Sequence, residues 1–236
     1  MSTSDTQFPL MLDARDAYAR WAPSYDDTPN PLTALEERLL VPTVREFSGR
    51  DIVDLGCGTG RWLHRLQSIA PRSLAGIDVS SAMLAQAGKK CLLSTRLIEA
   101  DCTSTPLSSR SADCVLASFV LSYVQDIGRF AAEAARILRP GGALIVSDLH
   151  PDTPTYGWRR TFRAAGSVFE VGTFCYTLGS LITEMKVAGL ALEQLAEASF
   201  GEEEATIFRA SGKVEYFQRV ASLPVIYIAR FSRGVD

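Results

Sequence analysis

Three glycines follow a short apolar run near residue 55, in an arrangement that suits a polar ligand. The stretch VDLGCGTGR (53–61) places Gly56, Gly58 and Gly60 directly after residues typical of a buried strand. A strand that ends in glycines and leads into a helix brings main-chain N–H groups and the positive helix end toward a ligand. The stretch therefore predicts a ligand-binding turn, with a tight turn needed only for packing as the alternative.

The spacing of these glycines argues against a nicotinamide dinucleotide as the ligand. The dinucleotide fingerprint is G-x-G-x-x-G, which, counted from Gly56 and Gly58, requires its third glycine at position 61. That position holds Arg61, and the third glycine stands one place earlier. An oxidoreductase that uses NAD is therefore disfavoured.

Composition disfavours several other classes of protein. The chain has 236 residues, a formal charge of −3 and 47% hydrophobic residues, which predicts one large domain without a basic surface for nucleic acid. No run approaches the ~20 apolar residues that span a bilayer, and no signal-peptide core is found, so we expect a cytoplasmic protein. The five cysteines form no CxxC pair, and only two histidines occur, His64 and His150, which predicts neither a disulfide framework nor a metal site.

Short apolar runs alternate with helical patterns over most of the chain. Runs rich in Val, Ile and Leu and bounded by turn residues predict strands at 51–55, 73–78, 95–100, 112–118 and 143–148. Helical spacing lies between them, and the helix before the last of these strands is predicted to stop at Pro140-Gly141-Gly142. Alternating strands and helices predict a parallel sheet covered on both faces, which binds ligands beyond the carboxyl ends of its strands.

The remaining part of the chain, 151–236, is where we expect the choice of substrate to be made. Residues 159–177 alternate as a hairpin does, with a turn near Ala165-Gly166, and their aromatic side chains suit either a substrate pocket or a core. The patterns also predict a helix ending at Gly189, strands at 190–198 and 223–233, and a helical or mobile flap at 201–220. The first 30 residues are expected to form the other wall of a lid.

Segments spread over this alternating pattern resemble the class I S-adenosylmethionine-dependent methyltransferases, and in particular the methyltransferase-11 or quinone-biosynthesis-like branch. The similar segments, in the order of that family, are DLGCGTG (54–60), GIDVSSAMLAQA (76–87), EADCTSTPL (99–107), ADCVLASFVLSYVQD (112–126) and LRPGGALIVSD (138–148). YARWAPSYDD (18–27) is similar to the N-terminal cap of the quinone-biosynthesis branch.

The resemblance implies the fold in detail. It is a Rossmann-like, doubly wound α/β fold with a seven-stranded sheet in the order 3-2-1-4-5-7-6, the last strand antiparallel, and helices on both faces. A single domain is expected, divided into an N-terminal helical cap (1–30), a cofactor-binding core (31–150) and a substrate-side region with a C-terminal hairpin (151–236).

The resemblance also implies the cofactor, S-adenosyl-L-methionine, and residues for its nucleoside part. A carboxylate at the end of the second strand can accept hydrogen bonds from both ribose hydroxyls, and Asp78 is so placed. Asp101 is implied as the acceptor for the adenine amino group, unless it only caps a turn, with the Cys102 main-chain N–H on the ring. Val79 and Met83 would cover the faces of adenine, with core filling as the alternative for Met83.

A second group of residues is implied for the methionine part of the cofactor. Asp54 and the Cys57 carbonyl would meet the cationic amino group, and Arg61 would pair with the carboxylate unless it is simply solvated. The implied group is completed by Tyr18, Tyr25, Ser118 and the glycines Gly56, Gly58 and Gly60.

The cofactor determines what the protein must do. A sulfonium makes its methyl carbon electrophilic, so the protein has mainly to hold a nucleophile in line with the C–S bond and exclude water. A phenol, hydroxyl or acidic C–H would gain from a general base, and His150, two residues past the fifth strand, is the candidate, unless it is a loop histidine bonded to backbone. Asp148, Tyr123 and Tyr156 are secondary candidates, and His64 is predicted to be solvated surface.

Together these observations predict an enzyme that methylates a small-molecule acceptor and leaves S-adenosyl-L-homocysteine. O- or C-methylation of an aromatic, quinone-like or secondary-metabolite acceptor is favoured. The alternatives are N-methylation of a small amine, or a protein that binds the cofactor without catalysis.

Overall fold

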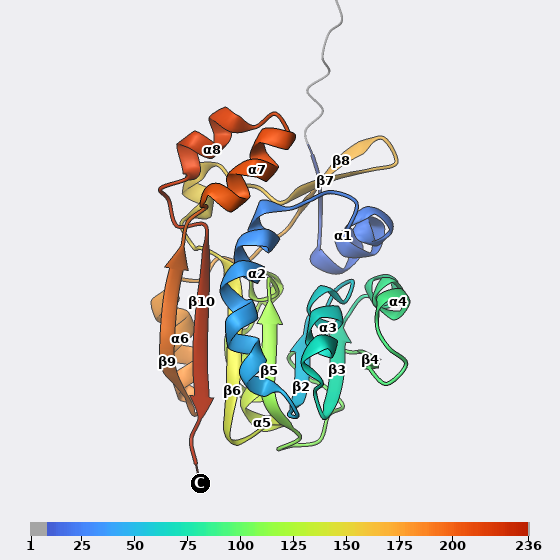
Figure 1. The fold of residues 1–236 in the computed structure, drawn as a ribbon, viewed down its shortest axis with the longest axis vertical. Helices are drawn as coiled ribbons and strands as arrows, with labels where there is room; N and C mark the ends of the chain where they lie inside the picture. The colour runs from blue at the N-terminus through green and yellow to red at the C-terminus, as the bar shows by residue number, and fades with distance from the viewer. Residues whose placement is uncertain (1–8, 236) are drawn as a thin grey trace, which may run out of the picture.

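A seven-stranded sheet runs through the centre of the molecule, as Figure 1 shows for a computed structural model that describes residues 9–235. Its strands, from one edge to the other, are β4 (Arg96–Glu99), β3 (Ser73–Asp78), β2 (Asp51–Leu55), β5 (Ala112–Ser118), β6 (Leu138–Leu149), β10 (Ile226–Arg233) and β9 (Leu190–Ala198). Counted in chain order within this sheet, the strands lie as 3-2-1-4-5-7-6. β10 is antiparallel to both of its neighbours, while the pairs from β4 to β6 are parallel.

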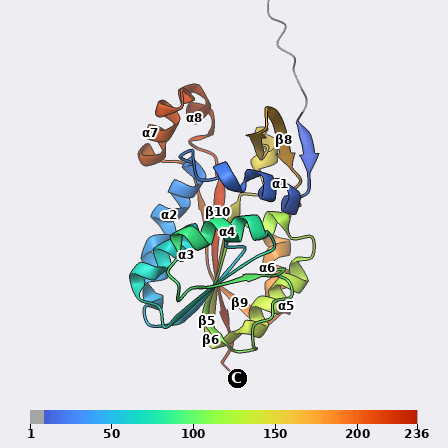
Figure 2. The same cartoon turned by 90° about the vertical axis from the view of Figure 1, so that its right-hand side faces the viewer.

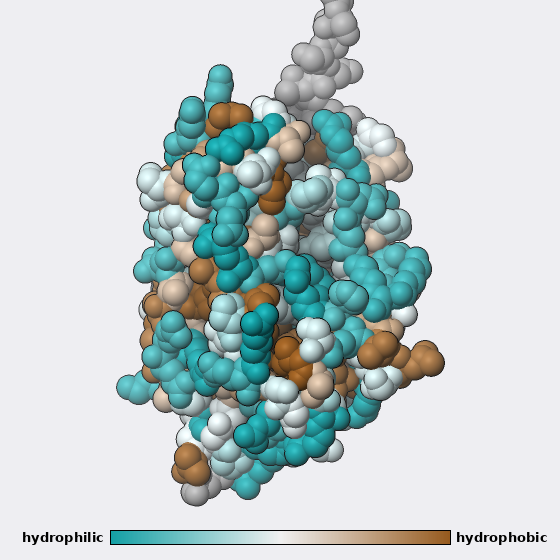
Figure 3. Space-filling view, viewed as in Figure 1, coloured by the Kyte–Doolittle hydropathy of each residue, from teal (hydrophilic) through white to brown (hydrophobic). Residues whose placement is uncertain are grey.

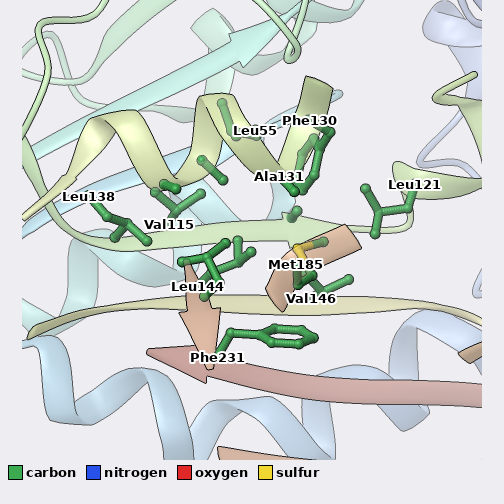
Figure 4. Packing of buried hydrophobic residues seen from close by; sticks show 14 of the residues in the cluster. Leu55, Val115, Leu121, Phe130, Ala131, Leu138, Leu144, Val146, Met185 and Phe231 are labelled. Atoms are coloured by element: carbon green, nitrogen blue, oxygen red, sulfur yellow. The ribbon is translucent and has the colours of Figure 1, made fainter. Parts of the chain in front are cut away.

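Helices cover both faces of the sheet, because side chains of each buried strand alternate between two cores. Val53 and Leu55 of β2 pack on the side of α5 (Ile127–Ile137) and α6 (Leu178–Val187), where Figure 4 shows Leu55, Phe130 and Met185 in the core. Ile52 packs on the other side, against α2 (Pro31–Val44) and α3 (Arg61–Leu66). Helix α4 (Ser81–Lys90) connects β3 to β4. The predicted doubly wound α/β architecture is confirmed.

The junction between α5 and β6 differs from the prediction. The helix ends at Ile137, before Pro140-Gly141-Gly142, and these three residues already belong to β6. The pairing of β5 with β6 is irregular there, since Ala112 lies opposite Leu138 and Cys114 opposite Ala143. A proline, which lacks an N–H, and a glycine at φ +74° are accommodated by such an irregularity without ending the strand.

A second sheet lies above the carboxyl ends of the first. It joins β1 (Leu10–Leu12), β8 (Ser167–Val171) and β7 (Thr161–Ala164) in the order β1-β8-β7. The predicted hairpin is present, and its turn residues Ala165 and Gly166 have φ of 48° and 80°, as a type I′ turn requires. The parallel pairing of β1 with β8 was not predicted. Figure 2 shows α1 (Ala14–Trp21) beside this sheet, and the hairpin packs on it through Phe162 and Phe169.

Residues 201–220 form two helices inserted between β9 and β10, which decides between the helical and mobile alternatives. These are α7 (Glu202–Ala210) and α8 (Val214–Val220). Glu204 at the start of α7 is buried and accepts two hydrogen bonds of 3.0 Å from Arg38 of α2. The insertion is therefore anchored to the middle of α2. Short 3-10 turns complete the chain at Ala22–Ser24, Arg45–Phe47, Gln67–Ile69, Leu121–Tyr123 and Thr153–Tyr156.

The outer surface is mixed in character. The face drawn in Figure 3 is largely hydrophilic, with hydrophobic residues in small separate groups. Across residues 9–235, helices are all too short or too polar to cross a membrane.

Candidate functional site

A cavity of about 1190 Å³ lies at the carboxyl ends of β2, β3 and β5. Its walls come from the turn after β2, the ends of β3 and β5, helix α1 and the segment after β8. Pockets for small ligands and cofactors typically hold about 300–1,000 Å³, so this cavity has room for a nucleoside cofactor and a second molecule.

The glycine-rich turn is held against the end of β3 by hydrogen bonds. The main-chain N–H groups of Gly56 and Cys57 both donate to the carbonyl of Ile77, and the Gly58 N–H donates to Asp78 Oδ2 at 2.8 Å. Gly56 has φ of 74°, and a Cβ on it would lie 2.4 Å from Val120 Cγ2. Glycine is therefore required there both by conformation and by space.

Asp78 stands where the turn meets the cavity. Its Oδ1 accepts the Ser80 N–H at 2.9 Å, and the Val79 N–H also lies close to the carboxylate, which can accept about four hydrogen bonds in all. Burial raises the pKa of Asp78, while these main-chain donors lower it. A fixed carboxylate with free lone pairs at a cavity wall is an acceptor for two adjacent hydroxyl groups.

Asp54, in β2, carries an unpartnered oxygen. Its side chain is 1% exposed, and within residues 9–235 its Oδ1 has no hydrogen-bond partner. Burial raises the pKa of Asp54 to about 8. A buried carboxylate without partners is unfavourable, and a cationic group in the cavity would satisfy it.

Glu36 of α2 is a buried acid that sequence reasoning missed. It is 0% exposed and accepts hydrogen bonds from Arg61, Ser147, Ser118 Oγ at 2.6 Å and Trp62 Nε1 at 3.2 Å. The signal was present in the sequence, because Glu36 occupies the helical stripe between Leu32 and Leu40, both hydrophobic.

The Glu36 network determines the position of Arg61. Besides Glu36, the guanidinium donates to Glu37 Oε1 at 3.2 Å and to Ser118 Oγ at 3.0 Å. Arg61 lines the cavity, but much of its hydrogen-bonding capacity is engaged by these neighbours. The alternative of a merely solvated arginine is wrong.

Aromatic side chains form the wall beneath α1. Tyr18 and Tyr123 share a hydrogen bond of 2.7 Å between their hydroxyl groups, and Tyr25 packs on Tyr18 with ring centres 5.8 Å apart. Burial raises the pKa of Tyr25 to about 12 and that of Tyr123 well above 10. These phenols therefore keep their protons at neutral pH and act as hydrogen-bond donors.

The structure brings nearly all the residues expected at the cofactor to one cavity. Those that line it are Tyr18, Tyr25, Asp54, Gly56, Cys57, Gly58, Arg61, Asp78, Val79, Met83, Asp101, Cys102 and Ser118. Gly60 does not line it; this residue precedes α3 with φ of 80° and packs against Ala87. Asp101 accepts the Thr103 N–H at 2.7 Å and so also caps a turn. Their individual roles stay predictions.

His150 lies elsewhere. It lines a second cavity of about 540 Å³ that also contains Asp148, and it is absent from the wall of the first. Its Nε2 is 2.7 Å from Glu197 Oε2, and its Nδ1 accepts the Asp152 N–H at 3.2 Å. Both ring nitrogens are thus engaged, which favours the reading of a loop histidine bonded to its surroundings.

The secondary candidates for the general base also lie in different places. Tyr123 lines the first cavity and Asp148 the second, where Asp148 accepts the N–H and hydroxyl of Ser122 at 2.8 and 2.7 Å. Tyr156 lines neither cavity. His64 is exposed on α3, as predicted.

Comparison with known proteins finds similarity to methyltransferases over part of the chain. Residues 53–146 match a family model described as a methyltransferase domain. The malonyl-[acyl-carrier protein] O-methyltransferase of Hahella chejuensis is 37% identical over 116 residues, which cover 48% of this chain and 42% of that protein. The demethylmenaquinone methyltransferase of Tropheryma whipplei is 32% identical over 148 residues, which cover 59% of this chain and 60% of that protein. The chain therefore spans about half the length of these curated relatives.

Solved structures agree on the fold. An S-adenosylmethionine-dependent methyltransferase from Mesorhizobium loti superposes with a TM-score of 0.66 at 23% identity, over 84% of this chain and 100% of that one. The [4+2]-cyclase SpnF superposes with a TM-score of 0.71 at 18% identity, over 98% of this chain and 100% of that one. Residues 53–146 are thus similar to a methyltransferase domain, and the fold is that of S-adenosylmethionine-dependent methyltransferases, as the motifs predict.

Proposed function

We propose that this protein is an S-adenosylmethionine-dependent methyltransferase that acts on a small-molecule acceptor. The observation that carries the proposal is the presence, in one cavity, of the fixed Asp78 carboxylate and the unpartnered Asp54 oxygen. The first suits two ribose hydroxyls and the second suits an ammonium group, and the two groups occur together in this cofactor. The residues present therefore fit the cofactor.

The residues of the chain bind the cofactor and orient it toward the acceptor. Asp78 and the turn at Gly58 hold the nucleoside, and Asp54 takes the amino group, while Arg61 remains near the carboxylate end. The bound cofactor supplies a sulfonium methyl group that is electrophilic without further activation. The aromatic wall of Tyr18, Tyr25 and Tyr123 excludes water from the place where the acceptor approaches in line with the C–S bond.

The favoured acceptor is an aromatic, quinone-like or secondary-metabolite molecule methylated at oxygen or carbon. Support comes from the aromatic residues that line the first cavity, which are Tyr18, Tyr25, Trp62, Phe119, Tyr123, Phe174 and Tyr176. The names of the matched relatives, which include a demethylmenaquinone methyltransferase, point the same way. N-methylation of an amine stays the alternative.

Two measurements test the proposal. S-adenosylmethionine or its demethylated product should raise the melting temperature of the full chain, whereas NAD(H) should not; the reverse result would overturn the proposal. Incubation with a labelled methyl donor and a panel of phenols, quinones, amines and carboxylic acids should then yield labelled product. Binding without any product would favour a non-catalytic cofactor-binding protein, because a fold and a cofactor site do not by themselves establish catalysis.

A further inference from the structure

Arg160, just before β7, is a partly buried cation with an unpartnered guanidinium nitrogen. Its Nη2 is shielded from solvent and has no hydrogen-bond partner within residues 9–235. Its Nη1 donates to the Tyr18 hydroxyl at 3.3 Å, and its guanidinium lies 5.7 Å from the ring centre of Tyr123. Within residues 9–235 no carboxylate lies in ion-pair contact with it; the charge of Asp148, which is hydrogen-bonded to Ser122, acts on it only from a longer distance.

The position of Arg160 connects the two cavities. Arg160 itself lines the second cavity, whereas its neighbours Tyr18, Tyr123 and Phe119 line the first. An arginine keeps its charge at any physiological pH, and a buried charged donor such as Nη2 that has no acceptor is unfavourable. A ligand that brings a negative charge to this place would remove the penalty.

A second hydrogen-bond donor stands beside the guanidinium. Tyr18 and Tyr123 contribute two phenolic protons but share only one hydrogen bond, and the Tyr18 oxygen already accepts from Arg160. Whichever phenol donates in that bond, the proton of the other is left to point at a ligand. Arg160 Nη2 and one phenol thus offer two donors to a single anionic group.

We propose, on the basis of the proposed function, that the methyl acceptor carries a carboxylate that binds between Arg160 and the Tyr18–Tyr123 pair. A carboxylate matches the two donors, because its two oxygens accept hydrogen bonds from adjacent groups. The guanidinium then orients the acceptor toward the cofactor cavity, and the aromatic rings around it pack on the rest of the molecule.

The test compares carboxylates with their neutral amides. Calorimetric titration of the full chain, saturated with S-adenosyl-L-homocysteine, uses two probe pairs: phenylacetate with phenylacetamide, and hexanoate with hexanamide. In at least one pair the carboxylate should bind about tenfold more tightly than the amide, as expected for hydrogen bonds to a charged group. Equal binding of carboxylate and amide in both pairs would overturn the proposal, and this comparison needs no variant.

Variants locate the site. Arg160→Met should remove the preference for the carboxylate while still binding S-adenosyl-L-homocysteine. Arg163→Met, an exposed arginine on the same hairpin, should keep the preference. A preference that survives Arg160→Met would place the carboxylate elsewhere. If the wild-type protein fails to bind S-adenosyl-L-homocysteine, the proposed function fails; if it binds that molecule but shows no preference, only this inference fails.

Discussion

The carboxylate of Asp78 accepts a 2.8 Å hydrogen bond from the main-chain N–H of Gly58, which joins the end of β3 to the turn after β2. Two neighbouring parallel strands are thereby tied together at the edge where this fold binds ligands. The acid holds the turn in shape and, with its remaining lone pairs, faces the cavity.

Replacing Asp78 should therefore weaken cofactor binding. Asp78→Ala removes the acceptor for the ribose hydroxyls, and the affinity for S-adenosylmethionine, measured by calorimetry, should fall by about 1–3 kcal/mol. Asp27→Ala, an exposed acid, is the control and should leave the affinity unchanged. Unchanged affinity in Asp78→Ala would mean that the ribose lies elsewhere.

The buried acid Asp54 should make the ligand-free protein less stable as the pH rises. Its carboxyl keeps a proton in the folded state up to about pH 8, whereas the unfolded chain loses that proton near pH 4. Between these values the folded state binds the extra proton, so this group lowers stability progressively from about pH 4 to pH 8. Asp54→Asn should therefore raise the melting temperature more at pH 8 than at pH 5. An equal effect at both pH values would contradict the assignment.

Gly56 should be far less replaceable than another glycine with a similar backbone. An alanine at 56 would clash with Val120 at a positive φ of 74°, and we expect a loss of about 2–3 kcal/mol in the free energy of unfolding. Gly212, at φ 69° with no atoms within 4 Å, should lose only about 1 kcal/mol on the same change. The free energy of unfolding of both variants can be measured by urea titration. Equal losses in the two variants would contradict the proposed clash with Val120.

The hydrogen bonds and the ion pair of Glu36 should contribute to the free energy of unfolding. Glu36→Gln leaves the Arg61 guanidinium without its buried counter-charge, and loss of one partner of a buried pair destabilises by about 3–5 kcal/mol. Glu203→Gln, in an exposed pair with Arg38, should change the free energy of unfolding by less than about 0.5 kcal/mol. Denaturant titration of the two variants gives both numbers. A small effect at Glu36 would show that Arg61 finds other partners.

His150 should not govern the rate of methyl transfer. His150→Ala removes a hydrogen bond to Glu197 and should lower stability by about 1 kcal/mol, but the pH dependence of the rate should stay as in the wild type. A profile that flattens near neutral pH would return His150 to the role of general base.

Local patterns allowed the central strands to be predicted closely. β2, β3 and β5 begin and end at the predicted residues because each is a continuous apolar run bounded by turn residues. The three-residue β1 escaped prediction, since it has too few residues for a period and its partner β8 is remote in the sequence.

The site residues likewise divide into those that the local sequence indicates and those that depend on contacts between distant segments. The glycine turn could be found from spacing, and Asp78 from its place at the end of a strand together with the family resemblance, whereas the positions of Glu36 and Arg160 depend on packing between distant segments. Arg160 illustrates the difficulty, because its neighbour Arg159 has the same residue type but is exposed and pairs with Glu170. Nothing in the local sequence distinguishes the two arginines.

The pairing of β1 with β8 has a consequence for how the site admits its ligands. Leu12 accepts a main-chain hydrogen bond of 2.8 Å from Gly172, so the segment ahead of α1 is joined to the hairpin that follows the core. Thr173 and Phe174, directly after this pairing, line both cavities. Any displacement of the joined segment would therefore change a wall of each cavity at once.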